Sequence, residues 1–218
     1  MVSDNLSALY DKLPSAVKLV AVSKFHPVSR LMEAYQAGQR IFGENRPQEL
    51  AGKVPQMPAD VEWHFIGHLQ TNKLKLVLPY VSLVQSVDSF HLLEAISRWG
   101  QENDRIVDIL LELHLGAEDT KHGFSEEDIL KLCSGSTPTS IRIRGLMGMA
   151  TNTEDEAVIE ADFARIEALF NRIREERPEW RETFTELSIG MSGDWPLAVR
   201  HGATMVRIGT DIFGPREY

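Results

Sequence analysis

A lysine at the end of an apolar segment is the first residue in this sequence that could do chemistry. Across residues 18–24, Val20 and Val22 alternate with other residues at the two-residue period of a β-strand, so Lys24 falls on the same side as both valines. A lysine whose stem lies along an apolar face tends to lose its charge, and the neutral amine is a nucleophile suited to Schiff-base formation. The alternative is an ordinary lysine whose ammonium group reaches water.

Two loops near the end of the chain combine small residues with hydroxyl groups. They are residues 191–195, Met-Ser-Gly-Asp-Trp, and residues 207–211, Arg-Ile-Gly-Thr-Asp. Ser192 and Thr210 can donate hydroxyl hydrogen bonds, and Gly209 lets backbone N–H groups approach an anion closely. These loops suit a phosphate group, although glycine, serine and threonine also occur in ordinary turns.

Other chemical motifs are incomplete. Residues 190–194 nearly match the GxSxG motif of serine hydrolases, but Asp194 stands where the second glycine belongs. His64 and His68 are four residues apart on a predicted strand and its loop, a spacing that does not put both on one face, and no third ligand is nearby. We therefore expect no metal site. No P-loop pattern occurs in the sequence.

The elements that must position these residues alternate along the chain. The sequence predicts a short leading helix over residues 3–12 and then eight strands, each followed by a helix or turn: 18–24, 40–43, 62–67, 82–87, 106–113, 142–147, 184–189 and 204–208. Lys24, Asn45, Gly67 and Asp88 follow one another at steps of 21, 22 and 21 residues (45−24, 67−45, 88−67). Such even steps predict an α/β fold, a single (β/α)8 TIM-type barrel domain spanning residues 1–218.

A doubly wound open sheet is the alternative fold, but no GxGxxG motif follows the first strand. In a barrel, the carboxyl ends of the strands form the functional face, and a phosphate often binds between the last two loops. The barrel prediction therefore brings together the polar and glycine residues that follow the strands: Lys24, Asn45, His68, Asp88, Lys121, Ser192, Gly209 and Thr210.

The most regular helical pattern spans residues 153–177. Its apolar positions recur at helical spacing and predict a core-facing stripe: Ile159, Phe163, Ile166, Phe170 and Ile173. The preceding residues 153–156, Thr-Glu-Asp-Glu, match a capping box with Thr153 as the N-cap.

Composition and charge exclude several classes of protein. A net charge of −9 argues against nucleic acid or an anionic membrane as the main partner. Cys133 is the single cysteine, so no disulfide framework is expected. The first ten residues lack the pattern of a signal peptide, and no apolar run approaches membrane-spanning length. We expect a cytoplasmic protein.

Five motifs in order carry a family resemblance. They are residues 20–24 (Val-Ala-Val-Ser-Lys), 42–46 (Phe-Gly-Glu-Asn-Arg), 63–73 (Trp-His-Phe-Ile-Gly-His-Leu-Gln-Thr-Asn-Lys), 190–194 (Gly-Met-Ser-Gly-Asp) and 206–214 (Val-Arg-Ile-Gly-Thr-Asp-Ile-Phe-Gly). From about residue 17 onward the sequence resembles the pyridoxal phosphate homeostasis protein family, which shares the barrel of the alanine racemase N-terminal domain. The departures are small: Pro47 stands where valine is expected, and Ile189 where methionine is expected.

The resemblance implies a pyridoxal 5′-phosphate (PLP) site. Lys24 would form the Schiff base with the cofactor, and Arg207 would lie near the pyridine nitrogen. The phosphate would be held by Ser192, Gly209 and Thr210, and Asn45 would lie at the pocket. A cation opposite the ring nitrogen disfavours its protonation, so the ring would be a poorer electron sink than one paired with a carboxylate.

Three functions compete at this point. The resemblance implies a non-catalytic PLP binder that buffers the cofactor or delivers it to apo-enzymes. The second is a PLP-dependent racemase of the alanine racemase type, and the third is a barrel enzyme acting on a phosphorylated metabolite. Racemases of this type use a tyrosine from a partner subunit's second domain, and the four tyrosines here show no such role from their sequence positions: Tyr10, Tyr35, Tyr80 and Tyr218. We expect a non-catalytic monomer.

Overall fold

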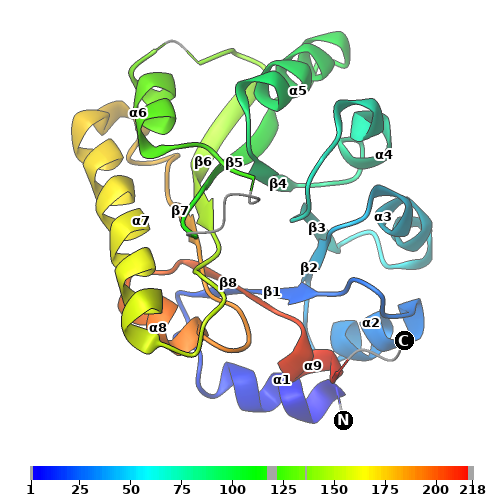
Figure 1. Ribbon diagram of the computed structural model, residues 1–218. Coiled ribbons are helices and arrows are strands. Elements are labelled where there is room, and N and C mark those ends of the chain that lie inside the picture. Colours follow the sequence, from blue (N-terminus) through cyan, green and yellow to red (C-terminus); the bar gives the residue numbers. More distant parts are fainter. Residues whose placement is uncertain (1, 117–121, 136, 216–218) are drawn as a thin grey trace.

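Eight parallel strands close into a barrel in chain order, with helices around the outside (Figure 1). The computed structural model describes residues 2–116, 122–135 and 137–215. The strands are β1 (Lys18–Val22), β2 (Ile41–Glu44), β3 (Glu62–Phe65), β4 (Leu83–Val87), β5 (Val107–Leu113), β6 (Ile141–Gly148), β7 (Glu186–Ser188) and β8 (Met205–Ile208). The predicted (β/α)8 barrel is confirmed.

The helices follow the strands as the alternating pattern predicts. The α-helices are α1 (Val2–Tyr10), α2 (Val28–Gln36), α3 (Pro47–Lys53), α4 (Leu74–Val77), α5 (Phe90–Glu102), α6 (Glu126–Ser134), α7 (Glu156–Glu176), α8 (Trp195–Arg200) and α9 (Thr210–Phe213). Short 3₁₀ turns lie at Val54–Gln56, Thr71–Lys73 and Pro178–Trp180. Within the described ranges, no helix is both long and apolar enough to cross a membrane.

Two apolar layers hold the barrel together. The larger layer lies between the strands and the helices and contains Leu19 and Ala21 of β1. The smaller layer lies inside the barrel, where Val20 packs with side chains from β4, β5, β6 and β8: Leu83, Leu110, Met147 and Met205. Residues of β1 therefore alternate between the two layers, as the two-residue period predicts.

Helix α7 buries the predicted stripe but begins differently from the prediction. Ile159, Phe163, Ile166, Phe170 and Ile173 are all buried against the barrel. The capping-box prediction is wrong, because the N-cap is Asp155, whose carboxylate accepts a hydrogen bond from the Ala157 N–H at 3.0 Å. The Thr153 hydroxyl accepts one from the Asp155 N–H instead and forms a turn before the helix.

Two predicted elements are shorter in the structure. The helix or turn expected after the third strand is a 3₁₀ turn followed by one turn of α4, which stops before Pro79. The first strand was predicted to reach Lys24, but β1 ends at Val22 and Lys24 lies in a turn. This turn requires a positive φ of 67° at Phe25, which ends the extended backbone.

Candidate functional site

A cavity of about 350 Å³ opens at the carboxyl ends of the strands. Three residues of the predicted site line it: Lys24, Asn45 and Arg207. The remaining lining comes mainly from the ends of β1, β3, β5 and β6: Val22, Ile66, Gly67, His68, Glu112, Leu113, His114, Leu115, His122, Met149 and Met191. The volume lies within the range of small-molecule sites. Val22 and Lys24 both line the cavity, although Lys24 lies in the turn beyond the end of β1.

The turn that carries Lys24 is fixed on both sides. Ser23 donates its N–H to the Gly43 carbonyl at 3.0 Å and its hydroxyl to Glu44 Oε1 at 2.7 Å. On the other side, the Phe25 N–H donates to Glu49 Oε2 at 2.8 Å. These hydrogen bonds hold the backbone on both sides of Lys24 in place.

A buried ion cluster supports this turn, and we call Ser23, Glu44, Glu49 and Lys53 the β1–β2 clamp. The Lys53 ammonium donates to Glu44 Oε1 at 2.6 Å, to the Ser23 carbonyl at 2.9 Å and to Glu49 Oε2 at 3.1 Å. Burial raises the pKa of Glu44, and Lys53 opposes that rise. Burial also acts to raise the pKa of Glu49, but the Phe25 N–H and Lys53 outweigh it, so this pKa is lowered.

Arg207 lies fully inside the barrel and ends a chain of hydrogen bonds. Its guanidinium donates to the Ser188 carbonyl and hydroxyl, both at 2.7 Å, and to the Gly148 carbonyl at 2.9 Å. The Ser188 hydroxyl donates to Gln85 Oε1 at 2.7 Å, and Gln85 Nε2 lies 2.9 Å from His64 Nδ1.

Burial shifts the pKa values of the two ionisable residues in this series of hydrogen bonds. It lowers the pKa of His64 to about 3, so the ring is neutral at pH 7 and can accept a hydrogen bond from Gln85. Burial also lowers the pKa of Arg207 to about 10, while the charges of Glu112 and Asp194 oppose the change. Arg207 therefore remains a positioned cation at pH 7.

Glu112 is a functional candidate that the sequence interpretation missed. It lies on β5 and lines the same cavity as Lys24 and Arg207. Burial and then the charge of Asp88 raise the pKa of Glu112 to about 7, against the opposing effect of Arg207. It can therefore hold or lose a proton near neutral pH. The available signal was a carboxylate near the end of the otherwise apolar segment 109–113.

Asn45 and His68 lie where the barrel prediction puts them. Asn45 Oδ1 is buried and has no hydrogen-bond partner among the described residues, so it is an acceptor available to a ligand. Its loop packs closely on Gly67, where an added Cβ would lie only 2.4 Å from the Asn45 carbonyl oxygen. His68 Nδ1 lies 2.9 Å from Asp88 Oδ2, so these two predicted residues do come together. Lys121 lies outside the described residues.

The two loops predicted to bind phosphate adjoin the cavity. However, Ser192, Gly209 and Thr210 are not among the residues that line it. Met191, next to Ser192, does line it. Gly209 precedes α9 and packs on Val22, whose carbonyl oxygen would lie 3.2 Å from an added Cβ. The phosphate interpretation of these loops therefore stays a prediction.

This chain is similar to known proteins over the whole length of the barrel. The profile of the family described as "Alanine racemase, N-terminal domain" matches residues 1–217. The "Pyridoxal phosphate homeostasis protein" of Pasteurella multocida is 38% identical over 208 residues, covering 94% of this chain and 88% of that protein. The chain belongs to the pyridoxal phosphate homeostasis protein family.

Solved structures of PipY from Synechococcus elongatus have the same fold as this family member. The structure described as "without PLP" is 39% identical with a TM-score of 0.92, covering 98% of this chain and 100% of that one. The structure "with PLP bound" is 36% identical with a TM-score of 0.86 and the same coverage. Membership of the pyridoxal phosphate homeostasis protein family confirms the resemblance that the five motifs indicated.

Proposed function

We propose that this protein binds PLP and takes part in intracellular PLP homeostasis, buffering the cofactor or delivering it to apo-enzymes. In this proposal Lys24 holds the cofactor as a Schiff base, and the protein is cytoplasmic, monomeric and not an enzyme. The observation that carries the proposal is that Lys24, Asn45 and Arg207 line one cavity at the carboxyl ends of the barrel strands. Membership of the family and the PLP-bound PipY structure support it.

The cavity residues fit the chemical groups of PLP. The cofactor has an aldehyde that a lysine amine can attack, and the clamp fixes the turn from which Lys24 reaches the cavity. Asn45 Oδ1 offers an unpartnered acceptor, and Val22, Ile66 and Leu113 offer apolar wall for a flat ring.

The phosphate of the cofactor would bind at Ser192, Gly209 and Thr210. At the start of α9, the Ile212 and Phe213 N–H groups already donate to the Gly209 carbonyl. The phosphate would therefore bind the N–H groups of Thr210 and Asp211, which Gly209 lets it approach closely. This assignment rests on the family motif and on the contact of Gly209 with Val22 at the cavity wall.

The charge of Arg207 and the identity of the side chains that line the cavity both support a protein without catalytic activity. Bound PLP supplies an electron-withdrawing ring, and a cationic Arg207 at the ring nitrogen would disfavour the protonation that strengthens this effect. Tyr10, Tyr35 and Tyr80 do not line the cavity, and Tyr218 lies outside the described residues. The tyrosine acid–base group of the racemases therefore has no counterpart among the described lining residues.

The test is borohydride reduction of the PLP-loaded protein followed by peptide mapping. Lys24 Nζ replaces the aldehyde oxygen with loss of water. Hydride from borohydride then reduces the C=N bond to a C–N single bond, which leaves a stable pyridoxyl-lysine. The label should appear on Lys24, and Lys24→Ala should remove both the label and the visible absorption without unfolding the protein. Lys73→Ala is the matched control and should keep both. A label on Lys73 or Lys121 would overturn the assignment.

Two further measurements separate the alternatives. Pyridoxal, which lacks the phosphate, should bind far more weakly than PLP, and equal binding would contradict the phosphate site. Circular dichroism of L- and D-alanine incubated with the loaded protein should show no racemisation above free PLP. Turnover that disappears in Lys24→Ala would make the protein a racemase. Light scattering should give the monomer mass of 24.6 kDa.

A further inference from the structure

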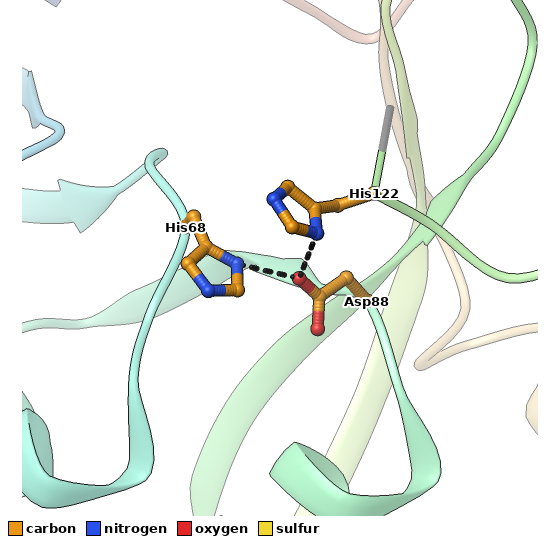
Figure 2. Close-up of side chains that lie close together, drawn as sticks. All are labelled: His68, Asp88 and His122. Atoms are coloured by element: carbon orange, nitrogen blue, oxygen red, sulfur yellow. Dashed lines mark hydrogen bonds and ion pairs between the residues drawn. The ribbon is translucent and has the colours of Figure 1, made fainter. Parts of the chain in front are cut away.

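Two histidines that line the cavity, His68 and His122, lie beside the carboxylate of Asp88 (Figure 2). His68 Nδ1 lies 2.9 Å from Asp88 Oδ2, and His122 Nδ1 lies 3.9 Å from the same oxygen. The three possible ligand atoms all lie within 4.8 Å of one another. Figure 2 shows both imidazole rings directed at Asp88 from different loops. We call these three residues the rim triad.

Three neighbouring strands position the rim triad. His68 follows β3, Asp88 follows β4 directly, and His122 lies in the segment between β5 and α6. The Ser86 hydroxyl donates to the Gly67 carbonyl at 2.5 Å and ties the end of β4 to the His68 loop. Because carboxyl ends of parallel strands meet at one end of a barrel, residues distant in sequence converge here.

The His122 segment is tied back to β5 by its own hydrogen bonds. The Phe124 N–H donates to the Glu112 carbonyl at 2.8 Å, and the His114 N–H donates to the Phe124 carbonyl at 3.0 Å. Gly123 has a φ of 130°, and an added Cβ there would lie 2.7 Å from the His114 nitrogen. The backbone directly after His122 is therefore fixed against the strand.

Charge and exposure at the rim triad suit a cation that enters from solvent. The Asp88 side chain is only 5% exposed, and its ion-pair partners among the described residues are the two histidines. The histidine side chains are 47% and 61% exposed. The buried carboxylate thus faces two accessible imidazoles rather than a lysine or arginine of the described chain.

We propose that His68, Asp88 and His122 form a binding site for a divalent transition-metal ion, with Zn²⁺ as the best match. Two imidazole nitrogens and one carboxylate oxygen are a ligand set that zinc accepts, with the fourth position left for water. Zinc bonds of about 2.0–2.2 Å put tetrahedral ligand atoms roughly 3.4 Å apart. The separations of 2.9 and 3.9 Å lie on either side of this value. The exposed histidine rings need only small rotations to equalise them.

The stacked arrangement of the rings is what the metal would rearrange. The two imidazoles lie face to face with centroids 4.1 Å apart and planes 16° apart. Without a metal, His68 Nδ1 lies within hydrogen-bond distance of Asp88 Oδ2, whereas His122 Nδ1, at 3.9 Å, does not. The sequence prediction of no metal site considered only the neighbourhood of His64 and His68, whereas the fold supplies the other two ligands from different loops.

The experiment is titration of tag-free protein with Zn²⁺ by calorimetry and with Co²⁺ by visible absorption. Both titrations are run on PLP-free and on PLP-loaded protein. We expect one ion per chain and the d–d bands of a low-coordinate Co²⁺ site. These readouts do not depend on Lys24, so failure of the metal site and failure of the proposed PLP function are distinguished.

The variants separate metal binding from the hydrogen-bonded cluster. His122→Asn keeps an N–H donor for Asp88 but removes an imidazole ligand, so affinity should fall at least about tenfold. His68→Asn and Asp88→Asn should have the same or a larger effect. His201→Asn is the matched control, since His201 pairs with Glu167 at 2.9 Å outside the triad, and it should bind like the wild type. Lack of saturable one-to-one binding, or equal affinity of wild type and His122→Asn, would overturn the proposal.

Discussion

The β1–β2 clamp and the rim triad are both polar clusters at the carboxyl end of the barrel, but they are built differently. In the clamp, a lysine with a 10% exposed side chain pairs with a fully buried Glu44 and with Glu49. In the rim triad, a buried Asp88 faces two exposed histidines. The clamp thus holds one buried cation between two carboxylates, whereas the rim triad holds one buried carboxylate beside two solvent-exposed imidazoles.

The difference separates a supporting role from a ligand-binding role. Each donor of the Lys53 ammonium has an acceptor, so Lys53 is more buried than Lys24 but is not available to a ligand. Lys24 takes its place beside the cavity because the clamp fixes both of its neighbours. Burial of an amine alone therefore does not make it available to a ligand, which also requires access to a cavity.

Breaking the clamp should have the largest effect on stability. Lys53→Met leaves Glu44 buried without its cation, and the free energy of unfolding should fall by about 3–5 kcal/mol in urea at pH 7. The raised pKa of Glu44 means that the folded state keeps its proton to higher pH, so this loss should diminish as the pH is lowered.

The compensated variant Glu44→Gln/Lys53→Met is the control for this prediction. It removes both charges and should recover much of the lost free energy. A loss below about 1 kcal/mol in Lys53→Met would show that the clamp is no tighter than a surface ion pair.

Replacing Glu112 should change the free energy of unfolding by an intermediate amount that depends on pH. Burial and then the charge of Asp88 raise the pKa of Glu112, and the charge of Arg207 lowers it. Its folded pKa of about 7 exceeds the ordinary 4.5, so the folded state binds more protons between these values and is destabilised as the pH rises. A rise of this size corresponds to roughly 3 kcal/mol. Glu112→Gln should therefore gain stability relative to wild type by about that amount between pH 4.5 and 7. Urea unfolding across this range is the measurement, and parallel pH profiles would contradict it.

Altering the rim triad should have the smallest effect on stability. His122→Asn removes an exposed ring whose contacts are partly screened by water, so unfolding should change by less than about 1 kcal/mol in the absence of metal. Urea unfolding in the presence of a chelator checks this. A loss above about 2 kcal/mol would show that the rim triad, like the clamp, supports the fold.

The barrel itself could be predicted because its signals are local and repeated. Strand alternation, even spacing and the apolar stripe of α7 all appear in short windows of sequence. The end of β1 could not be placed, because the turn at Lys24 depends on Glu49, which lies on another element. The N-cap of α7 was misassigned because Thr153 and Asp155 both have side chains that can cap a helix.

The site was partly predictable for the same reason. Lys24, Asn45 and Arg207 lie in motifs next to strand ends and line the cavity. Glu112 and His122 carry no local motif and take their significance from neighbours on other strands. Ser192, Gly209 and Thr210 remain predictions, because the lining of the cavity does not include them.

Closure of the barrel has a kinetic consequence for the pocket. Strand β1 pairs with β8, and Ala21 opposes Ile208 although 187 residues separate them along the chain (208−21). Contacts of such high sequence separation form slowly, since their loop-closure entropy must be overcome first. Lys24 follows β1 and Arg207 lies on β8, so they come to line one cavity only when these two strands pair. A molecule that binds both residues in the folded state would stabilise the pairing of β1 with β8. It would therefore slow unfolding of the barrel more than it speeds folding.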